Sequence, residues 1–373
     1  MNKVIIIGTD HINTLGVIRT FGENNIKSDV IIISNTKKIA VIKSKYVNKY
    51  TIINDINLLI EILLKEYKNE KVKPVIISTT DLIALELDNN YSVISDLFYL
   101  SNLKNQKLEY YMNKYNQFNL AKKNGIKTAK SEIFSIDSSK RNKIKFPVIL
   151  KPVLSAYGKK DDITICNNTT EFELAKTNYK NNGYKDFLVQ ELITYDSECD
   201  VAGFAYNGYI DIPGIILKEN IWPSNRGSTT YGKVVSTDKY KEEIELIKKM
   251  ILATGFNGIF DIDFFIKDNK LYFNEINFRN GALSYAYGKS KICYNWYKSL
   301  IENKYISCEK INSSYYFIDD NSHLHNIFDK DITIKQYFLH LKKSKIKLAF
   351  SSKDKKPWLL MIVYKLQQKL RIK

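Results

Sequence analysis

The stretch DIDFFIKDNKLYFNEINFRN, residues 261–280, decides the fold that this sequence predicts. It reads as two β-strands joined by a turn at residues 267–270. Side chains alternate along a strand, so the aromatic residues offer apolar surface on the strand pair. Asp263, Glu275 and Asn277 bring oxygen atoms to one end of that pair. The competing interpretation is a polar hairpin edge whose charges are solvated.

The oxygen atoms at this end of the hairpin favour a metal site. Glu275 and Asn277 are two residues apart and share a face, and Asp263 lies on the neighbouring strand. Three hard oxygen donors suit Mg²⁺, which prefers carboxylates and nucleotide phosphates. Arg279 follows two residues later and is placed to meet phosphate or carboxylate. The hairpin therefore predicts a Mg²⁺ and phosphate site.

Further elements that suit an anionic ligand precede the hairpin. Residues 146–152 form a short apolar strand that contains Lys151, and a lysine there is costly to bury unless it meets an anion. A small loop with two more lysines follows at residues 155–160. Residues 187–193 form another apolar strand that carries acid near its end, and Glu198 comes seven residues after Glu191. Along the chain, the strand with Lys151 comes first, then the loop with two lysines, then the second strand with its acids, and last the hairpin.

That order resembles the ATP-grasp superfamily, over about residues 3–303. The resemblance implies that ATP and Mg²⁺ are the cofactors, with two metal ions and Mn²⁺ as the alternative metal. It also implies the roles of particular residues. The implied nucleotide contacts are Lys114, Lys151, the phosphate-loop residues Ser155 and Gly158, the adenine hinge Gln190, Glu191, Leu192 and Ile193, and the ribose carboxylate Glu198. The implied metal ligands are Asp263, Glu275 and Asn277. The implied catalytic residues are Lys151, Arg279 and Arg226. The phosphate loop departs from the family pattern because it carries less glycine.

The N-terminal residues, to about 108, alternate strands with helices, which predicts a parallel sheet with covered faces. The expected strands are residues 4–7, 30–33 and 75–78, and the expected helices are residues 15–24 and 58–65. The first turn lacks the glycine spacing of a dinucleotide site. Residues 15–22 and 79–81 resemble ATP-grasp ligases that join amino acids to cell-surface precursors, including D-aspartate ligases. Arg19 in this segment either meets an anionic ligand or is a solvated surface residue.

The predicted fold class is therefore α/β, with α+β character in the nucleotide cleft. We expect an N-terminal parallel-sheet domain followed by a two-lobed ATP-grasp domain. In the second domain, residues 187–206 and 209–217 are expected to continue one sheet, and residues 237–253 are expected to form a helix that Gly255 ends. The expected boundaries are 1–108 for the first domain, 109–186 for the lid with its linker helix, 187–305 for the catalytic lobe and 306–373 for a C-terminal extension.

The composition limits the kinds of site, the cellular location and the partners that we expect. The 373 residues include four cysteines without paired spacing, which is typical of neither a disulfide framework nor a zinc site. No signal-peptide pattern opens the sequence, so a cytoplasmic location is expected. The net charge of +17 comes without a nucleic-acid-binding motif, and no nucleic-acid partner is expected.

The resemblance implies an ATP-dependent carboxylate–amine ligase that works through an acyl phosphate. Its partners would be a small carboxylate substrate, an amino acid, and an amine acceptor, a cell-wall or capsular precursor. The alternatives are a biotin-carboxylase-like or purine-pathway reaction and a non-catalytic nucleotide-binding regulatory protein. Two further candidates for anion contacts are Arg226, in the loop at residues 222–230, and Lys218, just before that loop. The other interpretation of Arg226 is an ordinary surface arginine.

The C-terminal tail joins an apolar run, residues 357–364, to four cations. Such a run is too short to span a bilayer but suits an interfacial helix on anionic lipid. The tail either contacts the inner face of the membrane or docks on its own domain. His323 and His325 form a weak metal signal, and surface histidines are the alternative.

Overall fold

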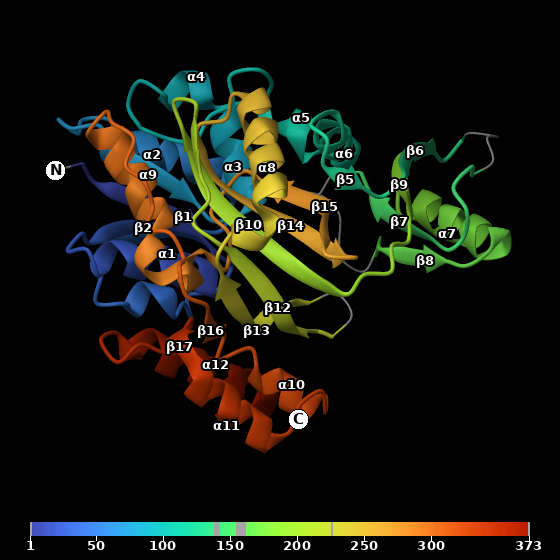
Figure 1. Cartoon of the computed structure of the whole chain (residues 1–373). Coiled ribbons are helices and arrows are strands. Elements are labelled where there is room, and N and C mark those ends of the chain that lie inside the picture. Colours follow the sequence, from blue (N-terminus) through green and yellow to red (C-terminus); the bar gives the residue numbers. More distant parts are fainter. Residues whose placement is uncertain (1, 138–141, 154–161, 225–226, 372–373) are drawn as a thin grey trace.

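The computed structural model describes residues 2–137, 142–153, 162–224 and 227–371. Three β-sheets with flanking helices are followed by a helical C-terminal segment (Figure 1). The fold is mixed α/β and confirms the predicted class. Among the described helices, none combines the length and the apolar character needed to cross a bilayer.

The N-terminal sheet is parallel, in the strand order β3-β2-β1-β4, which confirms the prediction from alternating elements. Strands β1, β2 and β4 are runs of valine and isoleucine that helices bury on both faces. The strands are β1 (Val4–Gly8), β2 (Ser28–Ile33), β3 (Val47–Ile53) and β4 (Val75–Ser78), and the helices are α1 (Ile12–Gly22), α2 (Leu59–Tyr67), α3 (Asp81–Asn89) and α4 (Tyr91–Ile94), with 3-10 turns η1 (Val41–Lys43) and η2 (Ile56–Leu58).

Arg19 on α1 is buried, so both interpretations that the sequence offered for it are wrong. Its guanidinium donates to Asp354 Oδ2 at 3.1 Å and to the carbonyl oxygen atoms of Leu348 and Asp354 at 3.0 and 2.9 Å. The side chains of Arg19 and Asp354 are 0% and 2% exposed. The C-terminal segment covers α1, which the local sequence around Arg19 could not reveal.

A small antiparallel sheet, in the order β6-β9-β7-β8, forms the small lobe together with α7. Its elements are β6 (Ser131–Ser135), β7 (Val148–Pro152), β8 (Thr164–Cys166), β9 (Asp186–Glu191) and α7 (Thr169–Asn181). The sequence placed residues 187–206 in one sheet, and this is corrected: β9 pairs with β6 and β7, whereas the next strand belongs to another sheet. An apolar strand pattern predicts burial but does not identify the sheet.

The large sheet runs in the order β17-β16-β13-β12-β10-β14-β15-β5, with β11 paired to β10. The predicted hairpin is its β14–β15 pair. The strands are β5 (Lys127–Thr128), β10 (Ser197–Tyr206), β11 (Tyr209–Asp211), β12 (Ile215–Trp222), β13 (Ser228–Val235), β14 (Gly258–Lys267), β15 (Lys270–Asn277), β16 (Tyr315–Ile318) and β17 (Ser344–Lys347).

Helices cover this sheet and connect it to its neighbours. They are α5 (Leu108–Met112), α6 (Lys114–Lys123), α8 (Lys241–Thr254) and α9 (Ile292–Ile301), with 3-10 turns η4 (Asp238–Tyr240) and η5 (Ser284–Ser290). Gly255 ends α8 with a φ of 65°, a left-handed conformation that glycine adopts without a Cβ clash. The sequence predicted this helix end correctly.

The C-terminal segment adds β16 and β17 to the edge of the large sheet and packs three helices beside them (Figure 1). These are α10 (Leu324–Phe328), α11 (Ile334–Lys343) and α12 (Lys355–Arg371). Trp358, Leu360 and Tyr364 on α12 pack against the main core, whereas Leu359 and Val363 are exposed. The apolar run of the tail therefore docks largely on the protein.

Candidate active site

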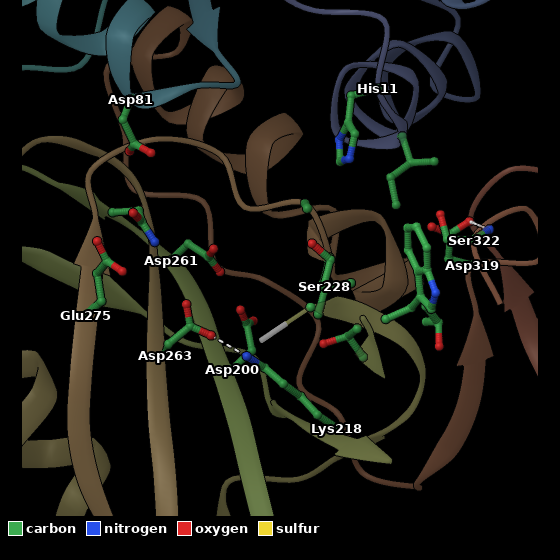
Figure 2. A pocket seen from close by; sticks show the side chains of 18 of the residues that line it. His11, Asp81, Asp200, Lys218, Ser228, Asp261, Asp263, Glu275, Asp319 and Ser322 are labelled. Atoms are coloured by element: carbon green, nitrogen blue, oxygen red, sulfur yellow. Dashed lines mark hydrogen bonds and ion pairs between the residues drawn. The ribbon is translucent and has the colours of Figure 1, made fainter. Parts of the chain in front are cut away.

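A cavity of about 700 Å³ lies where the N-terminal sheet, the large sheet and the C-terminal segment meet. Figure 2 shows acidic side chains and Lys218 around it. It is lined by Lys114 and Lys151 at one side, by Asp200, Asp261, Asp263, Glu275 and Asn277 from the large sheet, and by His11, Asp81, Arg279, Asp319 and Ser322 toward the N-terminal and C-terminal parts.

The three predicted metal ligands meet in this cavity because of the register of β14 and β15. Asp263 lies opposite Glu275, and Asn277 lies two residues further along the same face. Lys114 Nζ is 2.7 Å from Glu275 Oε1, and Lys218 Nζ is hydrogen-bonded to Asp263 Oδ1. Two carboxylates and an amide are the hard oxygen donors that Mg²⁺ prefers, so this donor set fits the metal.

Lysine side chains are paired with carboxylates that are proposed to bind metal or ribose. Within the described residues, no three histidine, cysteine or acidic side chains are positioned to hold a metal ion as they stand. Lys114 and Lys218 occupy oxygen atoms of Glu275 and Asp263, and Lys218 Nζ also lies 3.5 Å from Glu198 Oε2. A metal ion would have to displace these ammonium groups, at least in part. Lys218, a predicted anion contact, thus pairs with acids.

Lys151 enters the same cavity from β7 in the small lobe. It is half-buried, and its Nζ lies 3.3 Å from Asn274 Oδ1. Burial and, after it, the charge of Lys114 lower the pKa of Lys151 to about 8, against the opposite effects of Glu275 and Glu198. The backbone N–H of Lys114 donates to Val153 O at 2.9 Å, which ties α6 to the small lobe. A lysine with this pKa is poised to gain charge beside an anion.

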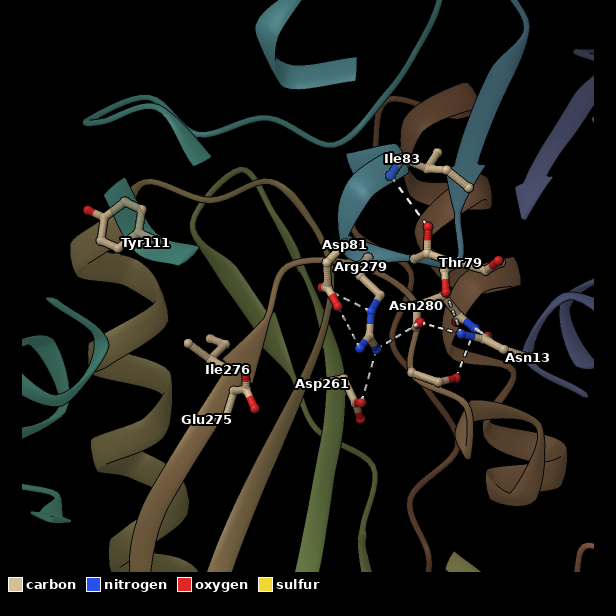
Figure 3. Close-up of polar contacts among 12 residues, drawn as sticks. Asn13, Thr79, Asp81, Ile83, Tyr111, Asp261, Glu275, Ile276, Arg279 and Asn280 are labelled. Atoms are coloured by element: carbon tan, nitrogen blue, oxygen red, sulfur yellow. Dashed lines mark hydrogen bonds and ion pairs between the residues drawn. The ribbon is translucent and has the colours of Figure 1, made fainter. Parts of the chain in front are cut away.

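Arg279 lies between two carboxylates, as Figure 3 shows. Its Nε is 3.2 Å from Asp81 Oδ1 and its Nη1 is 3.3 Å from Asp261 Oδ2. Burial alone would lower the pKa of Arg279, but Asp81 and Asp261 outweigh burial and raise it. A Cβ at Gly281 would lie 2.4 Å from the Asp261 carboxyl carbon, so only glycine allows this close approach. The arginine is held rigidly at the cavity wall.

The segment that follows β15 and carries Arg279 is fastened to the N-terminal domain by neutral hydrogen bonds (Figure 3). Asn13 Nδ2 donates to the carbonyl oxygen atoms of Thr79 and Asn280, each at 2.9 Å. Asn280 Nδ2 donates back to Asn13 Oδ1 at 2.6 Å. These bonds fix the position of Arg279 relative to Asp81.

Asp200 and Asp261 lie at the floor of the cavity, and the sequence assigned a role to neither. They are 3% and 6% exposed, and within the described residues Oδ1 of each has no hydrogen-bond partner. Burial raises the pKa of Asp200 well above its usual range, and the charge of Asp261 adds to the effect. Burial raises the pKa of Asp261 as well, so both adjacent carboxyl groups hold a proton more readily than an exposed aspartate does. Asp200 and Asp261 are each two residues from a predicted site residue, Glu198 and Asp263, so the alternation of side chains along a strand could have indicated both.

The predicted adenine hinge does not line this cavity. Gln190 is buried and its Nε2 donates to Ser131 Oγ at 3.0 Å, while the N–H groups of Glu191 and Leu192 donate to Lys130 O and Pro147 O. Gln190 and Glu191 are the last residues of β9, and Leu192 and Ile193 follow the strand. Glu198 connects to the cavity through Lys218. Ser155, Gly158 and Arg226 lie outside the described residues.

Asp319 reaches the cavity from the end of β16, and no sequence signal marked it. It is 3% exposed, and its Oδ1 accepts the N–H groups of Asn321 and Ser322 at 3.2 and 3.1 Å. Within the described part of the chain, it forms no ion pair with lysine or arginine. His323, four residues on, is buried rather than at the surface, and bonds to His340 and Thr230.

Comparison with known proteins agrees with this geometry. Residues 119–281 match the model of the ATP-grasp domain. The chain is 28% identical over 176 residues to a D-alanine–D-alanine ligase from Campylobacter jejuni, covering 44% of this chain and 49% of that protein. It is 24% identical to a formate-dependent phosphoribosylglycinamide formyltransferase from Prochlorococcus marinus, covering 74% of this chain and 69% of that protein.

The fold has a similar solved counterpart. An N5-carboxyaminoimidazole synthetase from Staphylococcus aureus, complexed with ADP, superposes with a TM-score of 0.64 at 16% identity, covering 95% of this chain and 92% of that one. The chain spans about half the length of the D-alanine–D-alanine ligases that it matches. The chain therefore carries an ATP-grasp domain at residues 119–281.

Proposed function

We propose that this chain is an ATP-dependent carboxylate–amine ligase that forms an amide through an acyl phosphate. The observation that supports it best is the single cavity in which Asp263, Glu275 and Asn277 meet Lys114, Lys151 and Arg279. Oxygen ligands for a metal and cations for phosphate stand together there. A protein that only binds a nucleotide has no need of the whole set, which argues against a purely regulatory role.

The chemistry follows from the weakness of a carboxylate as an electrophile. An amine neutralises a free carboxylic acid by proton transfer instead of attacking it. Transfer of the γ-phosphoryl group of ATP to a carboxylate oxygen gives an acyl phosphate and ADP. The amine then attacks the acyl carbon, inorganic phosphate leaves, and one proton is released. Lys151 and Arg279 would stabilise the negative charge that gathers on the transferred group.

The nucleotide would lie between the small lobe and the large sheet. We propose Lys114 and Lys151 as phosphate contacts, residues 190–193 as the adenine hinge, Glu198 at the ribose, and the loop with Ser155 and Gly158 over the phosphates. Asp263, Glu275 and Asn277 would hold Mg²⁺, or Mn²⁺, as one or two ions, which neutralise phosphate charge and polarise the transferred group. Arg226 is a further candidate for an anion contact.

We propose that the amine substrate is recognised at the end of the cavity near Asp319. A buried carboxylate without an ion-pair partner is costly unless a cation meets it, and the ammonium group of the amine acceptor supplies one before it loses a proton and attacks. The carboxylate substrate would lie nearer Arg279, and the acceptor would be a cell-wall or capsular precursor. The site of this reaction would be the cytoplasm.

A purine-pathway reaction is the second candidate. The matched formate-dependent formyltransferase covers more of this chain than the ligases do. Its name points to formate as the carboxylate and to a phosphoribosyl compound as the amine, so the bond-forming chemistry would be similar. A phosphoribosyl amine would bring negative charge, however, and Asp319 and Asp81 are unfavourable neighbours for it.

ADP release separates these possibilities. The purified full chain is incubated with ATP and Mg²⁺ and with D-amino acids, L-amino acids, formate or bicarbonate, each with and without an added amine. The ligase proposal expects ADP only in the presence of an amino acid. ADP formation with formate or bicarbonate but with no amino acid would favour the second candidate, and tight ATP binding without turnover would favour a regulatory protein.

A further inference from the structure

Helix α11 has two faces of unequal polarity, and its exposed face is partly apolar. Tyr337 and Leu341 face inward and pack in a cluster beneath the helix. Ile334 and Phe338 are 63% and 62% exposed, and Leu339 is 45% exposed. Ile334 and Phe338 are four residues apart, so they lie side by side on the helix surface. A folded protein rarely leaves such large apolar side chains together in water without a use for them.

Lysines accompany these apolar side chains on the same face. Lys335 and Lys342 share the exposed side of α11 with Ile334, Phe338 and Leu339, and we call these five residues the α11 face. Lys343 is exposed at the end of the helix, and Lys330 is exposed just before it. Within the described residues, none of these four lysines forms an ion pair.

Two acids near the α11 face, Asp329 and Asp331, are exposed and are hydrogen-bonded to neighbouring side chains. Asp329 Oδ2 accepts from Trp222 Nε1 at 2.6 Å, and Asp331 Oδ2 accepts from Ser224 Oγ at 2.7 Å. Between positions 324 and 371 the sequence has twelve lysine and arginine residues and three aspartates. This segment therefore supplies more than half of the net charge of +17.

The helices around the α11 face form one structural unit, as their grouping in Figure 1 shows. His323, just before α10, bonds to His340 of α11 at 2.9 Å, and Lys365 of α12 donates to Asn321 O at 3.3 Å. Phe328 at the end of α10 is 65% exposed. The unit presents apolar groups on a rigid and positively charged support.

We propose that the α11 face binds the surface of an anionic lipid bilayer. Ile334, Phe338 and Leu339 would enter the boundary between headgroups and acyl chains, and the lysines would meet lipid phosphates. The choice of occupant rests on charge complementarity: apolar side chains flanked by exposed lysines fit an anionic interface. The contact is made by α11, whereas the tail helix α12 is largely committed to the core.

The α11 face belongs to a segment of the chain that also forms part of the cavity wall. The segment that leads into α10 also supplies Asp319 and Ser322 to the cavity wall, and Trp222, another wall residue, is bonded to Asp329. Docking through α11 would hold the cavity close to the headgroups. An amine acceptor carried on a lipid could then be reached without leaving the membrane, a consequence that depends on the proposed ligase function, whereas lipid binding itself does not.

Vesicle co-sedimentation of the full chain tests the proposal. One set of vesicles contains phosphatidylglycerol and phosphatidylcholine in equal parts, and the other contains phosphatidylcholine alone. We expect binding to the anionic set only, weakened by salt, because salt screens lysine–phosphate attraction. Replacing both exposed apolar residues, Ile334→Glu with Phe338→Glu, should lower the partition coefficient roughly tenfold or more.

Matched variants separate this surface from general stickiness. Leu174→Glu removes an apolar residue that is 64% exposed on α7, and should bind vesicles as the unaltered chain does. Lys342→Glu with Lys343→Glu should weaken binding, whereas Lys122→Glu with Lys123→Glu, in the last turn of α6, should not. Circular dichroism verifies that each variant is folded.

Equal binding to both vesicle sets, equal loss in the two lysine pairs, or no binding at all would overturn the proposal. So would light scattering that shows the α11 variants converting a dimer into a monomer, since the face would then join two copies of the chain. ADP release is measured in parallel without vesicles: a failure there concerns the ligase function and leaves the lipid result unaffected.

Discussion

Lys114 Nζ lies 2.7 Å from Glu275 Oε1, although the two residues are 161 positions apart in the chain. The contact joins the start of α6 to the end of β15. It places a lysine proposed to bind phosphate directly on a carboxylate proposed to bind metal. Nucleotide and metal binding are therefore expected to be coupled, because Mg²⁺ on Glu275 would release Lys114 toward the phosphates.

Glu275→Gln should reduce ADP formation by at least ~100-fold, since loss of a metal ligand costs more than loss of a supporting group. The change keeps the size of the side chain, so the unfolding midpoint should move little. Steady-state ADP release with saturating substrates measures the effect. Glu132→Gln, on the small lobe away from the cavity, is the control; near-normal turnover in a folded Glu275→Gln protein would remove the proposed metal role.

ATP binding should depend on the charge of Lys151. Burial, aided by Lys114, lowers the pKa of Lys151 to about 8, so the side chain is charged below that pH and neutral above it. Phosphates bind the charged form, so ATP affinity should fall as the pH rises through about 8. Just above pH 8, binding should take up a proton, which calorimetry in two buffers of different ionisation enthalpy detects.

Lys151→Met should abolish this proton uptake and weaken ATP binding by ~1.5–3 kcal/mol, the usual contribution of a charge-assisted contact. Lys145→Met, at an exposed position in the same lobe, should leave both unchanged. If Lys151→Met bound ATP with unchanged affinity, Lys151 would have no role in nucleotide binding, and only the methylene groups of its side chain would contribute, through packing.

The buried Arg19–Asp354 pair should carry much of the attachment of the C-terminal segment. Arg19→Met would leave the Asp354 charge buried, and breaking such a pair typically costs ~3–5 kcal/mol of unfolding free energy. Urea denaturation measures this. Lys241→Met breaks an exposed pair with Asp238 and should cost under ~1 kcal/mol. If Arg19→Met cost no more than Lys241→Met, the Arg19–Asp354 pair would be dispensable.

Asp319→Asn tests where the amine is recognised. Asparagine keeps an oxygen that can accept the N–H groups of Asn321 and Ser322, but it loses the charge. The KM for the amine substrate should rise roughly tenfold or more, while the KM for ATP stays the same. Asp320→Asn is the matched control, because Asp320 is equally buried but is bonded to the N–H groups of Ala349 and Phe350. A similar KM in both variants would place the amine elsewhere.

The hairpin could be predicted from the sequence because its signal is local. Alternation over two short strands fixes which side chains share a face, so Asp263, Glu275 and Asn277 were found without knowledge of the rest of the fold. The left-handed Gly255 that ends α8 was found for a similar reason, since glycine there has a local conformational cause.

The remaining features depend on contacts between distant segments. Asp319 reaches the cavity only because β16 pairs with β13, and Arg19 is buried only because the chain returns more than three hundred residues later. The sequence around either residue carries no trace of this. Strand β9 was assigned to a sheet it does not join because an apolar run is compatible with any buried sheet.

Oxygen transfer tests the acyl-phosphate proposal most directly. The carboxylate substrate identified by the ADP screen is prepared with ¹⁸O in its carboxyl group, and the inorganic phosphate formed is analysed by mass spectrometry. The account predicts that each phosphate released carries one ¹⁸O from the carboxylate, because the acyl carbon–oxygen bond breaks when the amine attacks. Phosphate without the label, formed together with ADP, would show that water or another group had received the phosphoryl group and would contradict the account.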